Sequence, residues 1–171
     1  MTIQDWGAIG ELIGGGAVIV TLIYLALQIR QNTRAIKLST VHGIAESFRS
    51  QYALVGQSDS VAELYTTGLL RPETLDQSQG VQFYALMHNM VRGYEDAYYQ
   101  HAEGALDSKY WSGMQSQMCD SVSAQGFQNY WGDRKQWYSK SFQKHVNEVL
   151  LPGAKNGFKY GGSSVGVETQ Q

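Results

Sequence analysis

The feature that most constrains this chain is an uncharged, apolar run from Leu12 to Ile29. As an α-helix rising about 1.5 Å per residue, the run would extend about 27 Å, close to the roughly 30 Å hydrocarbon thickness of a bilayer. The carboxylate of Glu11 would lie at headgroup depth, where a charge costs far less than at the midplane. The run therefore predicts a transmembrane helix, with residues 1–30 as a membrane anchor.

Two other interpretations of this run are weighed against the anchor. A cleaved secretion signal would begin with basic residues and end at a small-x-small site, whereas the first charges here are Asp5 and Glu11 and the run ends in Gln28-Ile29-Arg30. A buried helix is the other alternative, in a soluble oligomer whose N-terminal helices share an apolar core. The rest of the chain is too short and too polar to bury the run easily in a monomer.

Charges on either side of the run predict its orientation. The N-terminal flank has no Lys or Arg, whereas the C-terminal flank carries Arg30, Arg34 and Lys37. Because basic residues stay on the cytoplasmic side, we expect the N-terminus outside and the rest of the chain in the cytoplasm.

Small residues recur along one face of the expected span. We call this set the small-residue seam: Gly7, Gly10, Gly14, Ala17 and Thr21. Small residues let membrane helices approach closely, so the seam favours self-association or pairing with another membrane protein. The alternative is that glycine is simply common in membrane helices.

The remaining chain predicts an all-α protein, in which the anchor runs into a long amphipathic helix that ends near Gly56 and a small helical bundle follows. Residues 31–152 form this helical domain, and residues 153–171, which lack periodicity, form a flexible tail. Capping patterns predict helix starts at Ser60 with Glu63, at Asp76 with Gln79, and at Asp107 or Ser108. The last helix should bury Phe142, Val146, Val149 and Leu150 and stop at Pro152-Gly153.

The sequence offers little for catalysis. The net charge of −2 gives no electrostatic case for nucleic acid, and Cys119 is the only cysteine, so neither an intramolecular disulfide nor a cysteine zinc site is expected. No phosphate-binding glycine loop and no Glu-x-x-His motif occurs, so no cofactor, no metal and no enzymatic activity are expected.

One polar cluster is a candidate ligand site. His88, Arg92, Glu95 and Tyr99 share one face of the helix predicted after Asp76. They either line a pocket for a small ligand or metal, or form an Arg92–Glu95 pair with solvated or hydrogen-bonded neighbours, which we favour. A second stretch, Asp133-Arg134-Lys135 between Trp131 and Trp137, suits a headgroup or an acidic partner, although a solvated stretch beside core aromatics is favoured.

Several motifs carry a resemblance to a known family. They are "IGELIG", "LIYLALQIRQNT", "YEDAYYQHAEGALD" and "GFQNYWGDRKQWYSKSFQKHVNEVL". In these the chain resembles a family of uncharacterised small bacterial membrane proteins that have an N-terminal span and a helical cytoplasmic domain. The resemblance covers nearly the whole chain except the tail, and it implies architecture but no activity.

These observations predict a single-pass inner-membrane protein whose cytoplasmic helical domain is an interaction or accessory module. The bilayer and a second membrane helix, from another copy or another protein, are the expected partners. The alternatives are a membrane-tethered domain that binds a ligand or metal, and a soluble helical oligomer with a shared apolar core.

Overall fold

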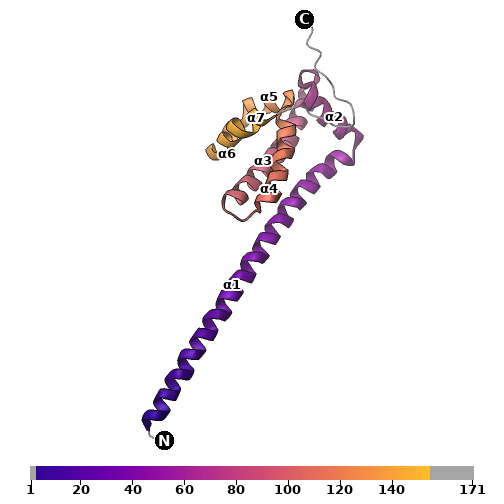
Figure 1. The fold of residues 1–171 in the computed structure, drawn as a ribbon. Helices are drawn as coiled ribbons and strands as arrows, with labels where there is room; N and C mark the ends of the chain where they lie inside the picture. The colour runs from indigo at the N-terminus through magenta and orange to yellow at the C-terminus, as the bar shows by residue number, and fades with distance from the viewer. Residues whose placement is uncertain (1–2, 155–171) are drawn as a thin grey trace. The chain divides into compact units, whose positions relative to one another are not determined.

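Helices make up nearly all of residues 3–154, the part of the chain that the computed structural model describes (Figure 1). No strand occurs within this range, so the predicted all-α fold is confirmed. Most of the predicted tail, residues 155–171, lies outside the described residues. The chain divides into two units, Met1–Ser39 and Thr40–Gln171, and the predicted anchor falls entirely within the first.

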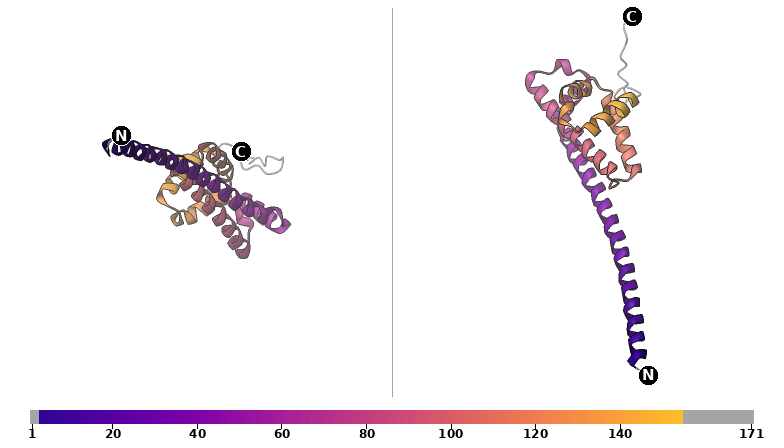
Figure 2. Two further views of the ribbon diagram at one scale, coloured as in Figure 1. Left: turned by 90° about the horizontal axis from the view of Figure 1, so that it is seen from below. Right: turned by 90° about the vertical axis from the view of Figure 1, so that its left-hand side faces the viewer.

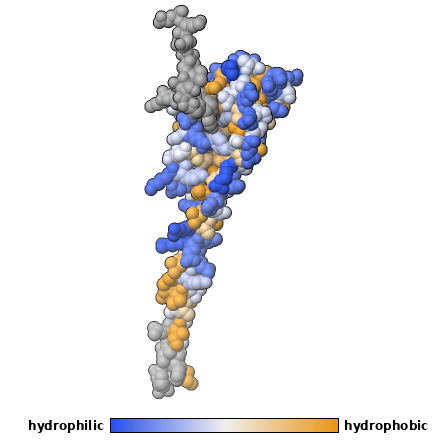
Figure 3. All heavy atoms as spheres, turned by 90° about the vertical axis from the view of Figure 1, so that its right-hand side faces the viewer, coloured by the Kyte–Doolittle hydropathy of each residue, from blue (hydrophilic) through white to orange (hydrophobic). Residues whose placement is uncertain are grey.

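The first unit consists of the N-terminal part of one helix, α1, which covers Ile3–Gly56 without interruption (Figure 2). This continuity confirms the expected passage of the apolar run into a longer helix. Its large apolar side chains between Ile13 and Ile29 are 46–67% exposed. In Figure 3 they appear as orange patches next to a band of hydrophilic atoms. By length and composition, Ile13–Gly56 is the one described helix that could cross a membrane.

The second unit contains the C-terminal part of α1, residues 40–56, and the helical bundle that follows it. The helices of the bundle are α2 (Asp59–Leu70), α3 (Gln77–Ala102), α4 (Ser108–Val122), α5 (Gln125–Arg134), α6 (Lys140–His145) and α7 (Leu151–Gly153). The 3₁₀ turns η1 (Pro72–Thr74) and η2 (Lys135–Trp137) and the π-helix η3 (Val146–Leu150) connect them. The long helix α3 runs through the middle of this unit and packs against α2, α4 and α5.

Aromatic side chains fill the core of the second unit. The fully buried rings include those of Phe83, Tyr94, Phe127, Tyr130 and Phe142. Rings of this size bury much apolar surface from a few short helices, and edge-to-face pairs add specificity. The chain's aromatic content thus supports a compact bundle without a disulfide.

Two of the predicted helix starts are confirmed. The Asp76 carboxylate accepts a hydrogen bond from the Gln79 backbone amide, and the Asp76 backbone amide donates one to the Gln79 side-chain oxygen, which completes the capping box. Asp107 caps α4 through the Lys109 amide. The prediction at Ser60 is wrong: α2 begins at Asp59, so Ser60 lies inside its first turn, where its hydroxyl contacts that of Ser58, 2.9 Å away.

The last helix departs from its predicted register. Phe142, Val146 and Leu150 are buried as expected, but Val149 is 43% exposed. The reason is the π turn of η3, in which each backbone hydrogen bond spans five residues instead of four. The extra residue in the turn rotates Val149 away from the core. The helix ends at Gly153, as predicted from Pro152-Gly153, and Pro152 itself lies in the first turn of α7, where proline is tolerated.

Candidate functional site

The four polar residues predicted on α3 face the segment from α5 to α6. We call these four residues, His88, Arg92, Glu95 and Tyr99, the polar row. At its N-terminal end, His88 Nδ1 lies 3.3 Å from the Tyr130 hydroxyl and 3.4 Å from that of Tyr138. One turn further, Arg92 donates to the Trp137 carbonyl oxygen at 3.1 Å. These hydrogen bonds connect the middle of α3 to α5 and η2.

The C-terminal end of the row contacts the start of α6. Glu95, only 3% exposed, pairs with Arg92 and accepts a 2.7 Å hydrogen bond from the Ser139 amide. The Tyr99 hydroxyl lies 3.3 Å from Ser141 Oγ. A buried carboxylate is stable only when such partners offset its lost hydration. Glu95 therefore has a structural role, which is to link α3 to the start of α6.

The polar row does not enclose one cavity. His88 lines a groove on one side of α3, whereas Tyr99 lines a separate hollow of about 330 Å³ between α1 and α3. Arg92 and Glu95 line neither of these spaces. The structure therefore brings the four predicted residues into one row of interhelix contacts, not around a common ligand.

Two buried tyrosines join the row to the core. The hydroxyl oxygens of Tyr130 and Tyr138 are 2.6 Å apart, and the Arg92 guanidinium lies 4.7 Å from the centre of the Tyr138 ring. Burial, together with the bond to Tyr130, raises the pKa of Tyr138 well above its usual value. Burial also raises the pKa of Tyr130, an effect that the bond to Tyr138 opposes. Both hydroxyls therefore stay protonated near neutral pH and act as hydrogen-bonding groups.

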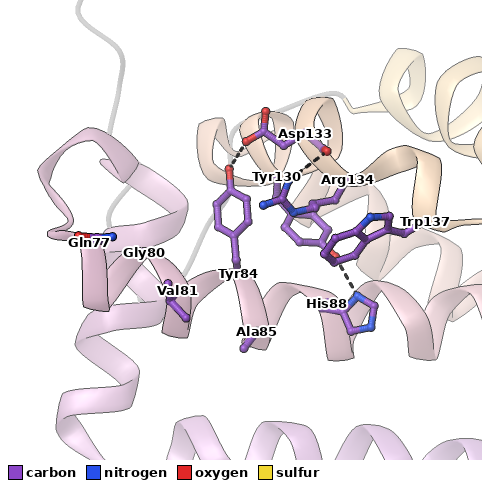
Figure 4. A pocket seen from close by; sticks show the side chains of 10 residues that line it. All are labelled: Gln77, Gly80, Val81, Tyr84, Ala85, His88, Tyr130, Asp133, Arg134 and Trp137. Atoms are coloured by element: carbon purple, nitrogen blue, oxygen red, sulfur yellow. Dashed lines mark hydrogen bonds between the residues drawn. The ribbon is translucent and has the colours of Figure 1, made fainter.

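The groove beside His88 has a volume of about 590 Å³, and we call it the Tyr84 groove. It lies between the first half of α3 and the end of α5 with η2 (Figure 4). Its lining residues are Gln77, Gly80, Val81, Tyr84, Ala85, His88, Tyr130, Asp133, Arg134 and Trp137. Ligand pockets commonly fall in this size range and combine apolar walls with a few polar groups.

Polar groups gather at the α5 side of the groove. The Arg134 guanidinium carbon lies 5.4 Å from the centre of the Tyr84 ring and 4.9 Å from that of Trp137. The Tyr84 hydroxyl donates to the Asp133 carboxylate at 2.7 Å. Burial and this bond to Asp133 raise the pKa of Tyr84 to about 12, so the hydroxyl keeps its proton.

The sequence predicted part of this groove. Asp133, Arg134 and Trp137 belong to the stretch noted as a possible binding segment, but Trp131 is buried in the core and Lys135 does not line the groove. Tyr84 was missed, although its position four residues before His88 extends the polar row by one turn.

The residues predicted for membrane association all lie on α1. Within the single chain, a Cβ added at Gly7, Gly10 or Gly14 would meet no atom within 4 Å. Thr21 Oγ1 donates to the Ala17 carbonyl oxygen at 2.8 Å, a bond that keeps its hydroxyl satisfied within the helix. The predicted topology residues Arg30, Arg34 and Lys37 are exposed. The small-residue seam is therefore open to a partner helix.

The described residues do not support a site for a metal ion. Between residues 3 and 154, no group of three or more His, Cys, Asp or Glu side chains could hold a metal ion. Comparison of the chain with protein-family models, with curated proteins and with solved structures finds no significant match.

Proposed function

We propose that this chain is a single-pass protein of the bacterial inner membrane, anchored by the first part of α1 and carrying a cytoplasmic helical interaction module. The observation that carries the proposal is the exposure of the large apolar side chains from Ile13 to Ile29. A continuous apolar surface around an isolated helix is unfavourable in water and favourable in hydrocarbon, where the helix satisfies its own backbone hydrogen bonds.

The charges that follow the span support a cytoplasmic second unit. Arg30, Arg34 and Lys37 come directly after Ile29, and all three are exposed. The resemblance of the N-terminal motifs to small bacterial membrane proteins supports the same arrangement, and we propose that the chain belongs with them.

A membrane extraction experiment tests the anchor. After expression in bacteria, we expect the full chain to stay in the membrane pellet through an alkaline carbonate wash and to be released by detergent. Ile19→Arg combined with Val20→Arg should shift the chain to the soluble fraction, because each arginine near the centre of a span costs about 3 kcal/mol. The matched control, Gln31→Arg with Asn32→Arg, adds the same charge beyond the span and should leave the chain in the pellet.

Release of the unaltered chain by carbonate would contradict the anchor. A released chain that sediments as a stable oligomer would instead support the soluble alternative, in which copies cover the apolar helix for one another.

The orientation is tested by labelling with a membrane-impermeant maleimide. In the double variant Cys119→Ala with Gln4→Cys, this reagent should label intact cells at residue 4. In the unaltered chain the same reagent should not reach Cys119 until the cells are broken.

A second candidate function is ligand binding by the second unit. The Tyr84 groove favours it, because this groove has the volume and the mixed apolar and polar lining of a small-molecule site.

A further inference from the structure

The Tyr84 groove holds two opposite charges that do not neutralise each other. Asp133 and Arg134 are neighbours in α5, and both line the groove. Within residues 3–154 no ion pair forms between them, nor between either of them and another side chain. This differs from the polar row, where Arg92 and Glu95 pair directly.

Arg134 keeps most of its hydrogen-bonding capacity. Its guanidinium lies over the Tyr84 and Trp137 rings, and its one hydrogen bond within the described residues is a 3.3 Å contact from Nη1 to the Asp133 carbonyl oxygen. An arginine has five N–H donors in a planar fork that matches a carboxylate. The flanking rings hold this fork in place, so less entropy is lost when an anion binds.

Asp133 likewise retains an acceptor. Its Oδ2 receives the Tyr84 hydroxyl, whereas Oδ1 has no donor among the residues that the structure describes. Since the pKa of Tyr84 is raised to about 12, this hydroxyl orients the carboxylate at neutral pH without removing its charge. The free oxygen can accept from an ammonium group.

Part of the remaining wall of the groove is apolar. Val81 is 67% exposed and Trp137 is 53% exposed, and both line the groove with Ala85 (Figure 4). A flat hydrophobic group placed there would cover the indole ring and gain from burial. The volume of about 590 Å³ leaves room for a ligand about the size of an aromatic amino acid.

We propose that the Tyr84 groove binds a small zwitterion with an aromatic side chain, that is, an aromatic α-amino acid. Its carboxylate pairs with Arg134, its ammonium group with Asp133, and its ring packs on Trp137 and Val81. A simple anion would be repelled by Asp133 and a simple cation by Arg134, whereas a zwitterion satisfies both charges. This proposal holds whether or not α1 spans a membrane.

Calorimetric titration of the full chain in detergent micelles tests the proposal. The probes are L-phenylalanine, L-tyrosine and L-tryptophan, with phenethylamine and 3-phenylpropionate as the analogues that lack one charge. We expect L-phenylalanine to bind saturably, and each analogue to bind about tenfold or more weakly than L-phenylalanine. No saturable binding of L-phenylalanine up to about 10 mM would overturn the proposal. Equal affinity for phenylalanine and either analogue would overturn it as well.

Two variants assign the two charges. Arg134→Gln should abolish the preference for L-phenylalanine over phenethylamine, and Asp133→Asn the preference over 3-phenylpropionate. The matched controls are Lys135→Gln and Asp120→Asn, which remove an exposed charge outside the groove and should leave both preferences intact. Preferences that survive Arg134→Gln and Asp133→Asn in folded protein would overturn the assignment.

Discussion

The carboxylate of Glu95 accepts a 2.7 Å hydrogen bond from the backbone amide of Ser139, the residue that caps α6. The same carboxylate pairs with Arg92 on its own helix, so one buried side chain links α3 to the start of α6. Because Glu95 is 3% exposed, these two partners replace the hydration that its carboxylate loses on burial.

Replacing Glu95 should therefore destabilise the second unit. We expect Glu95→Gln to lower the free energy of unfolding by about 2 kcal/mol, since the amide loses the charge-assisted bonds to Arg92 and Ser139. Denaturant unfolding of the full chain in micelles measures the change. Glu46→Gln is the control, because Glu46 pairs with Arg49 at the same three-residue spacing on an exposed helix face. Glu46→Gln should lower the free energy of unfolding by less than about 0.5 kcal/mol. A similar loss of stability in both variants would contradict the role of Glu95 as a buried link between α3 and α6.

The features that sequence predicted well are local. The Asp76 capping box depends on residues three apart, and the length of α1 depends on a stretch without breakers. Both signals are contained within one helix, so they can be read without knowledge of the packing. The exposure of Val149 could not be predicted in this way, because regular helical spacing does not anticipate a π turn.

The groove could be predicted only in part, because it joins positions far apart in the chain. Tyr84 and Asp133 are separated by 49 residues, and their contact follows from how α3 packs against α5. The sequence identifies the polar row of α3 and the stretch Asp133-Arg134-Lys135, but it does not identify Tyr84 and does not show that the two stretches meet. Equally, the periodicity of α3 placed His88 to Tyr99 on one face, yet it could not show that α6 covers Glu95.

The crossing of α2 and α5 should be intolerant of added bulk. A Cβ at Gly126 would overlap the Gly68 carbonyl oxygen, a backbone atom that cannot move aside cheaply. Gly126→Ala should therefore lower the free energy of unfolding by about 2 kcal/mol or more, measured in denaturant. Gly113→Ala in α4, where a Cβ meets no atom within 4 Å, is the control. It should leave stability unchanged or raise it by up to about 1 kcal/mol, and equal effects would contradict the close approach.

Stability should fall on acidification because of His145. Burial, and then nearby His101, lower the pKa of His145 below its ordinary 6.5. The Tyr98 and Trp111 rings pack around it at 4.9 and 5.7 Å, and His101 is the other titratable group stacked on Trp111. Below pH 6.5 the unfolded chain therefore binds a proton at this site more readily than the folded chain, so the free energy of unfolding decreases as pH falls.

His145→Phe should flatten that decrease below pH 6.5, since it keeps a ring and removes the titration. Denaturation midpoints measured across this range provide the readout. His42→Phe, which removes an exposed histidine of α1, should leave the slope unchanged. An unaltered slope in His145→Phe would show that other groups cause the acid sensitivity.

The small-residue seam should determine whether the α1 helices associate. Gly10 and Gly14 lie one turn apart on the same face, and side chains added there would meet nothing within the chain itself. Gly10→Leu and Gly14→Leu should therefore leave the fold of a single chain intact and weaken association, because leucine keeps the helix backbones apart. A membrane two-hybrid assay measures the effect. Gly16→Leu is the control, since it adds the same bulk on the opposite face of the helix. If all three variants keep the unaltered signal, the seam is not the contact face; if Gly16→Leu alone loses it, the partner packs on the other side of α1.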